Sequence, residues 1–256
     1  MAPDAQASGS MSPSGVFIAD DFRSNLIIDR YDPVFADMRA SKRKHLRSAN
    51  SEDAVTWNVF RSLRQVAPAD WLPAAWQRAF PALEPPADAG ATVRLWESVR
   101  PPLGLLADGD EGASEIDVIV ESASWVWFIE AKYRGDISPG TTTRPERDQV
   151  LRNLDVGTYY AGVRPFYFSL LVQSRGQSPV GAERVDRYGA PGAVRALLPH
   201  RRDGLANLAG VGVLTWVDLG GVLAAAAASA RREDERAFAS RARGWLADRG
   251  IIAPAV

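Results

Sequence analysis

The chain of 256 residues contains no cysteine and only two histidines, His45 and His200. Without cysteine it can form no disulfide, use no thiolate nucleophile and build no Cys-type zinc site. Two histidines also leave little room for a His-ligated zinc centre or a His-metal nuclease. The metal chemistry that remains open uses oxygen ligands, which suit Mg²⁺ or Mn²⁺.

Long apolar runs and a strong net charge are missing as well. The Ala-rich stretch at 222–230 is too short to cross a bilayer. The first 15 residues lack the charged and apolar regions of a secretory signal, and their small polar composition predicts a disordered tail at 1–15. We therefore expect a cytoplasmic protein with no membrane partner. The net charge of −1 means that no global positive field indicates a nucleic-acid partner.

The composition of the rest is that of a globular protein. With 46% hydrophobic residues, residues 16–256 can bury the core of a single domain. The order of the expected elements predicts an α/β fold, with a mixed central β-sheet of about five strands flanked by helices. The strands are expected at 92–98, 115–121, 126–132, 166–172 and 211–217, the later helices at 147–160, 219–230 and 232–248, and connections at 133–145 and 174–192.

The most informative segment is 115–132, which reads EIDVIVESASWVWFIEAK. Two apolar runs flank a short polar turn, so the segment predicts a β-hairpin with a two-residue loop. Counting back from that loop pairs Asp117 with Glu130 and Glu115 with Lys132. Because side chains alternate along a strand, these four should share one face. The opposite face is expected to form an apolar layer of Ile116, Val118, Val120, Trp127, Ile129 and Ala131.

An Asp directly opposite a Glu is unfavourable, because their Cβ atoms would lie roughly 5 Å apart. A hard divalent cation between Asp117 and Glu130 would remove the conflict. An alternative is an ordinary solvated face, with Glu115 and Lys132 as a cross-strand ion pair and the two acids at an exposed edge. Lysine usage favours a specific role for Lys132, because it is one of only three lysines in the chain.

Asp117 followed by Glu130-Ala131-Lys132 resembles the PD-(D/E)xK nuclease superfamily, which has an acid on one strand and Glu-x-Lys on the next. Ile116 stands where the superfamily pattern has proline. The resemblance covers roughly residues 50–218 and implies a restriction-endonuclease-like core.

A predicted helix upstream of the hairpin adds to the resemblance. Ser51 or Asn50 is expected to be the N-cap, and acids in the first turn suit the helix dipole. Glu52 lies on the side of an apolar stripe with helical spacing, made by Val55, Val59, Leu63 and Val66. In the superfamily a Glu from this helix often completes the metal site. The alternative is that Glu52 only caps its helix or pairs with the helix dipole.

A predicted helix downstream of the hairpin carries Gln149 and Asn153, which lie four residues apart on one face. The superfamily often places a Gln here, where it can orient the lysine or a water molecule. The alternative is an exposed polar helix face.

The resemblance implies a role for each of these residues in Mg²⁺-dependent hydrolysis, with Mn²⁺ as a second suitable metal. Lys132 would stabilise the attacking hydroxide or the charge on the phosphate, and Gln149 would position Lys132 or a water molecule. We expect Glu115 to be an ion-pair partner that tunes Lys132. The implied metal ligands are Glu52, Asp117, Glu130 and the carbonyl of Ala131.

Two basic clusters flank these motifs and could neutralise phosphates, although a charge run is also typical of a solvated helix face. The resemblance implies a metal-dependent DNA endonuclease of bacterial defence or DNA repair. The alternative is a catalytically inactive nuclease fold that binds nucleic acid or acts as a scaffold. Because such nucleases often act as dimers, the helix at 232–248 is a candidate homodimer surface. The residues expected to contact DNA are Lys42, Arg43, Lys44, Arg144, Arg147 and Arg152.

Overall fold

A computed structural model describes residues 8–86, 90–102, 112–140, 147–190 and 192–254 of the chain. Its centre is a five-stranded mixed sheet in the order β3-β4-β5-β6-β7. The first three strands are antiparallel, and β6 and β7 continue the sheet parallel to β5. This confirms the predicted α/β class. The strands are β3 (Thr92–Val99), β4 (Ser114–Glu121), β5 (Val126–Ala131), β6 (Phe166–Val172) and β7 (Leu208–Thr215).

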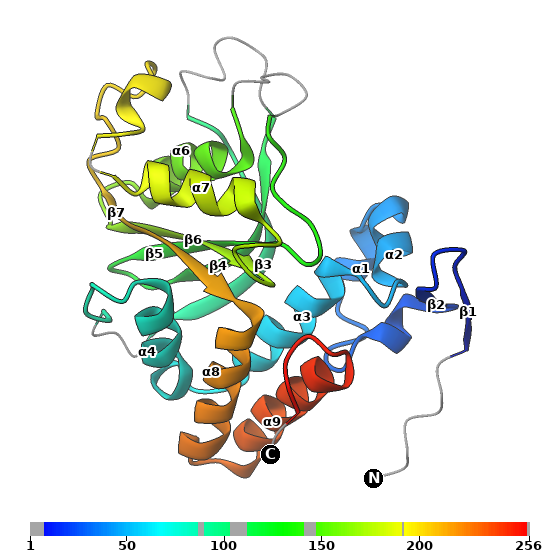
Figure 1. Ribbon diagram of the computed structural model, residues 1–256. Coiled ribbons are helices and arrows are strands. Elements are labelled where there is room, and N and C mark those ends of the chain that lie inside the picture. Colours follow the sequence, from blue (N-terminus) through cyan, green and yellow to red (C-terminus); the bar gives the residue numbers. More distant parts are fainter. Residues whose placement is uncertain (1–7, 87–89, 103–111, 141–146, 191, 255–256) are drawn as a thin grey trace.

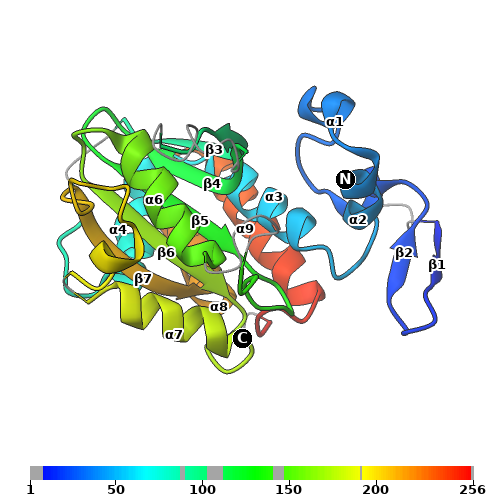
Figure 2. The ribbon, with the colours of Figure 1, turned by 90° about the horizontal axis from the view of Figure 1, so that it is seen from above.

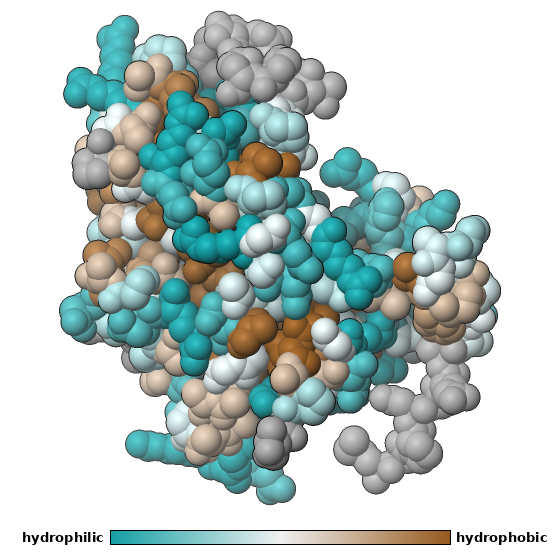
Figure 3. Space-filling view, viewed as in Figure 1, coloured by the Kyte–Doolittle hydropathy of each residue, from teal (hydrophilic) through white to brown (hydrophobic). Residues whose placement is uncertain are grey.

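Helices cover both faces of this sheet (Figure 1). One face packs against α6 (Gln149–Ala161) and α7 (Pro179–Tyr188). The other packs against α3 (Glu52–Leu63), α4 (Pro68–Ala79) and α8 (Trp216–Ser229), and α9 (Glu233–Asp248) packs against α3 and α8. Within the described residues, no helix combines the length and apolar character needed to cross a membrane. The face seen in Figure 3 is mostly hydrophilic, with small separate apolar patches.

The β4–β5 hairpin has the register predicted from the sequence. Val118 pairs with Ile129 and Glu121 with Val126, and the amide of Ser122 donates to the carbonyl of Trp125 at 3.0 Å. The hydrophobic pattern sets this register, because a slip of one residue would exchange the two faces of the strand.

One member of the predicted apolar layer lies elsewhere. Ile116 packs in the cluster of Ile119 and Phe128 under α6, whereas Val118 and Val120 pack under α3 and α4. The neighbouring strand is irregular at this point: Trp96 on β3 has a left-handed backbone with φ of 56°.

The N-terminal elements lie to one side of α3 (Figure 2). They are β1 (Gly9–Met11), β2 (Phe17–Ala19), a 3-10 turn at Phe22–Asn25, α1 (Val34–Asp37) and α2 (Ala40–Leu46). Strand β1 pairs with β2, which corrects the expectation of a disordered tail for the last part of 1–15. A separate cluster that includes Leu26, Leu46 and Trp57 joins this region to α3.

Helices α7 and α8 differ most from the sequence prediction. Helix α7 occupies part of the expected connection at 174–192; it starts with Pro179 at its first position and buries Ala182, Val185 and Tyr188 at helical spacing. Helix α8 starts at Trp216, earlier than expected, because the Thr215 and Asp218 side chains form a capping box.

Candidate active site at the end of strand β5

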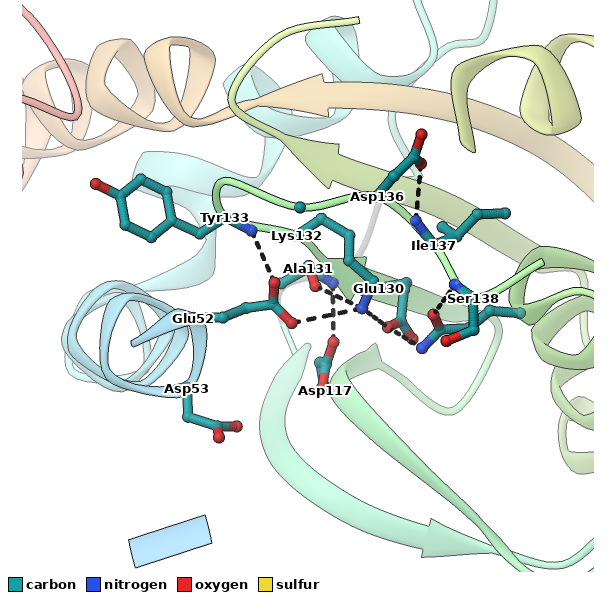
Figure 4. Close-up of polar contacts among 12 residues, drawn as sticks. Glu52, Asp53, Asp117, Glu130, Ala131, Lys132, Tyr133, Asp136, Ile137 and Ser138 are labelled. Carbon is teal, nitrogen blue, oxygen red and sulfur yellow. Dashed lines mark hydrogen bonds and ion pairs between the residues drawn. The ribbon is translucent and has the colours of Figure 1, made fainter. Parts of the chain in front are cut away.

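Glu52 reaches from the start of α3 towards the end of β5 (Figure 4). The helix is capped by Ser51, whose hydroxyl accepts a hydrogen bond from the amide of Ala54 at 3.2 Å. The Glu52 carboxylate is therefore not the cap. It accepts a hydrogen bond from the amide of Tyr133 at 2.7 Å, and its second oxygen lies 3.4 Å from Nζ of Lys132. Burial raises the pKa of Glu52, although Lys132 opposes the shift.

The side chain of Lys132 is almost fully buried among acceptors. Its Nζ donates to Oε1 of Glu130 at 2.6 Å and to the carbonyl of Ala131 at 3.1 Å, in addition to its contact with Glu52. Burial alone would lower the pKa of Lys132, but the negative charges of Glu130, Glu52 and Asp117 raise it above its usual value. Lys132 is therefore a fixed ammonium and not a proton acceptor at neutral pH.

Glu130 is held from a second side by α6. The amide of Gln149 donates to the same oxygen as Lys132 does, and the amide of Asn153 donates to Oε2 at 3.0 Å. The other end of Gln149 accepts from the amide of Ser138 at 3.3 Å. The helix starts at Gln149 because Asp148 caps it through the amide of Leu151. This geometry fixes both carboxylate oxygens of a side chain that is 3% exposed.

Asp117 lies where the hairpin opens. The β4–β5 pairing ends at Val118 and Ile129, and beyond it the Asp117 carboxylate accepts a hydrogen bond from the amide of Ala131 at 2.9 Å. Burial, and then the charge of Glu130, raise the pKa of Asp117 well above its usual value. The conflict between two carboxylates that the sequence indicates is therefore present in the structure.

The chemistry of these donors fits a hard divalent cation, because all of them are oxygens. Their present arrangement is not a ready metal cluster: in the described parts of the chain, no group of three or more acidic or histidine side chains is placed to hold an ion. The ammonium of Lys132 instead contacts three of the four expected ligands, Glu52, Glu130 and the carbonyl of Ala131.

Glu115 does not have the partner expected from the sequence. It forms an ion pair with Lys42 of α2, and Lys42 also lies 3.3 Å from Asp53 and 4.4 Å from the centre of the Trp96 ring. Pairing across the hairpin has ended before this point, so Glu115 is not opposite Lys132. The positive charge of Lys42, expected to contact DNA, is therefore already neutralised by two carboxylates.

The other residues expected to contact DNA differ widely in accessibility. Lys44 is exposed, and Arg43 donates to the carbonyls of Phe35 and Ala36 at 3.0 and 3.2 Å. Arg152 is half-buried, with its guanidinium 3.4 Å from the carbonyl of Ala113. Arg144 lies outside the described residues.

Arg147 corrects the sequence prediction most clearly. Its side chain is 4% exposed, and it donates to the buried carboxylate of Asp155 at 2.9 Å. Arg201 and His200 contact the same carboxylate at 2.9 and 2.7 Å. Since the guanidinium is enclosed by protein, Arg147 stabilises the fold and has no access to a phosphate.

The site also contains Asn153, for which the sequence predicted no role of its own. Asn153 shares its helix face with Gln149, and that spacing was the only sequence signal for it. The signal was insufficient because a polar pair at this spacing is equally typical of an exposed helix face.

Comparison of the chain with protein families, with curated proteins and with solved structures gave no match. The geometry of the site and the resemblance in the sequence are therefore the basis for a functional proposal.

Proposed function

We propose that the chain is a metal-dependent nuclease on a restriction-endonuclease-like core, which hydrolyses phosphodiester bonds of DNA with Mg²⁺ or Mn²⁺. The observation that carries the proposal is the convergence of three carboxylates and one ammonium. Glu52, Asp117 and Glu130 come from α3, β4 and β5, and among the described residues Lys132 alone opposes their negative charge. Burying excess negative charge is costly unless a cation balances it.

The ligands proposed for the metal are Glu52, Asp117, Glu130 and the carbonyl of Ala131. A bound divalent ion supplies Lewis acidity and an activated water molecule. Lys132 donates hydrogen bonds to negatively charged oxygens around the scissile phosphate and stabilises the charge that develops there. Gln149 and Asn153 hold Glu130 in one orientation, which keeps the carboxylate ready for its ligand.

Nicking of supercoiled plasmid tests this proposal. The wild type is expected to nick DNA with Mg²⁺ or Mn²⁺, and EDTA should stop the nicking. The substitutions Asp117→Ala and Lys132→Ala are each expected to abolish it. Asp186→Ala, which removes an exposed carboxylate paired with Arg175, is the matched control and should nick at the wild-type rate. Equal nicking by the wild type and both site variants would show that another site, or a contaminant, cleaves the DNA.

A second candidate is a nucleic-acid-binding or scaffolding protein of defence or repair systems that has the same fold but no turnover. It is favoured by the contacts of Lys132, which already engage most of the proposed metal ligands. Fold alone does not decide between the two functions. This candidate predicts DNA binding that needs no metal and that is unchanged in Asp117→Ala. It also predicts no cleavage of plasmid, branched DNA or RNA.

A further inference from the structure

A polar cavity of about 410 Å³ lies beside the candidate active site. Tyr133 and Arg134, from the segment after β5, and Gln173 and Gln177, from the segment after β6, form its walls together with Gly250. The cavity is therefore at the carboxyl ends of two parallel strands, where α/β folds commonly bind ligands. Its volume is within the range of roughly 300–1,000 Å³ that is usual for small-ligand pockets.

The guanidinium of Arg134 is oriented but not neutralised. Its Nε donates to the hydroxyl of Tyr133 at 3.2 Å, and the group lies 5.4 Å from the centre of the Tyr133 ring. In the described parts of the chain, no carboxylate pairs with Arg134. Its backbone has a φ of 60°, a conformation that is uncommon for a residue with a side chain and that concentrates at ligand sites. Tyr133 thus orients the guanidinium of Arg134, and among the described residues its terminal nitrogens have no carboxylate partner and can bind an anion.

Tyr133 also connects the cavity to the candidate active site, since its amide donates to Glu52 at 2.7 Å. On the opposite wall the Gln173 amide is anchored by the carbonyl of Ile251 at 2.8 Å. The carbonyl oxygen of Gln173 is buried and has no hydrogen-bond partner among the described residues. Gln177 is exposed at the rim. Such amides offer both donors and acceptors, which is the pattern needed to recognise the edge of a nucleobase.

We infer that this cavity binds one nucleotide of the substrate strand, with its phosphate on Arg134 and its base edge at Gln173 and Gln177. The inference rests on the proposed nuclease function and gives the strand a contact outside the scissile phosphate. A guanidinium binds phosphate through two parallel hydrogen bonds, and Arg134 retains its terminal nitrogens for them.

The test measures, by NMR titration in EDTA, the affinity of the metal-free protein for thymidine 5′-monophosphate. Parallel titrations measure its affinity for thymidine and for inorganic phosphate. Arg134→Asn removes the guanidinium, and asparagine tolerates the left-handed backbone. We expect it to weaken nucleotide binding about tenfold or more, because a charged hydrogen-bonding group is lost. Arg232→Asn is the matched control. Arg232 is an exposed arginine at the start of α9, whereas the cavity lies near the end of that helix. This variant should bind the nucleotide as the wild type does.

Equal affinity of the wild type and Arg134→Asn for the nucleotide would overturn the inference. Inorganic phosphate binding as tightly as the nucleotide would mean an adventitious ion only, and thymidine binding as tightly would remove the role of Arg134. Because EDTA excludes catalysis, the outcome is independent of cleavage. Plasmid nicking without nucleotide binding would overturn the inference about the cavity and leave the nuclease proposal standing. Nucleotide binding that depends on Arg134, without any cleavage, would support the cavity as a nucleotide site and count against the nuclease proposal.

Discussion

The ammonium of Lys132 lies 2.6 Å from Oε1 of Glu130, and the two side chains belong to residues that are separated only by Ala131. The same ammonium contacts Glu52 from α3. A single cation thus joins the sheet to a helix that is distant in sequence. Any metal ion that uses these two carboxylates must compete with an internal ammonium for them.

Lys132→Met is therefore expected to have two opposite effects. DNA cleavage should be lost, because no ammonium remains to stabilise charge on the phosphate. Mn²⁺ binding, measured by calorimetric titration, should become about tenfold tighter or more, because Glu130 and Glu52 lose their competing partner. Weaker Mn²⁺ binding by the variant would show that Lys132 supports the metal site and does not compete with it.

Asn153→Ala should lower metal affinity and cleavage about 10- to 100-fold, because Glu130 loses the donor that fixes its Oε2. Asn207→Ala is the matched control: its amide bonds the carbonyls of Thr158, Gly162 and Arg164 at the other end of α6. Metal titration and thermal unfolding of both variants separate the two effects. If both lose affinity equally, the loss at Asn153 comes from the stability of the helix.

Asp117→Asn is expected to stabilise the metal-free protein at neutral pH. Because folding raises the pKa of Asp117, the folded state holds this proton more tightly than the unfolded chain does. The stability contributed by protonated Asp117 is therefore complete at pH values below the unfolded pKa, near 4, and is lost as the pH rises towards the folded pKa. Thermal unfolding in EDTA should show a higher Tm for the variant at pH 8 and no gain at pH 4. An equal difference at both pH values would contradict this assignment.

Arg201→Met should destabilise the fold by about 3 kcal/mol, because it leaves the buried carboxylate of Asp155 with fewer partners. Arg175→Met removes an exposed arginine paired with Asp186 and should cost less than about 1 kcal/mol. Urea unfolding measures both changes. Comparable losses would mean that the Asp155 network is not a buried structural element.

Lys44→Ala and Lys42→Ala should separate an exposed cation from a neutralised one. If α2 contacts DNA, the loss of Lys44 should reduce the slope of log affinity against log salt concentration by about 1. Lys42 is already paired with Glu115 and Asp53, so its removal should lower the melting temperature and leave the slope unchanged. Fluorescence anisotropy at several salt concentrations provides the measurement, and identical slopes would exclude a phosphate contact by Lys44.

The sheet class, the hairpin register and the start of α3 could be predicted because each follows from local patterns. Apolar alternation fixes the pairing of Val118 with Ile129, and the cap at Ser51 lies next to the helix that it begins. Helix α6 starts at Gln149 and not at 147 as expected, because Asp148 caps it. The convergence of Glu52 and Gln149 on the hairpin was predicted through the resemblance.

The remaining contacts depend on partners that are remote in sequence. Lys42 and Glu115 are 73 residues apart, and no local pattern indicates that they meet. The burial of Arg147 likewise depends on Asp155 and on a segment around Arg201. Charge patterning could not distinguish a cation held inside the fold from one that faces solvent.

The hairpin register also has a consequence for the accuracy of folding. A slip of one residue in the pairing of Val118 with Ile129 would turn Glu130 and Lys132 towards the apolar layer under α3 and α4. Such a misfolded sheet would have to bury both charges without Gln149 and Asn153. The charged residues of the hairpin therefore disfavour a misregistered sheet, and a chain that completes the sheet in register has already brought Asp117, Glu130 and Lys132 together.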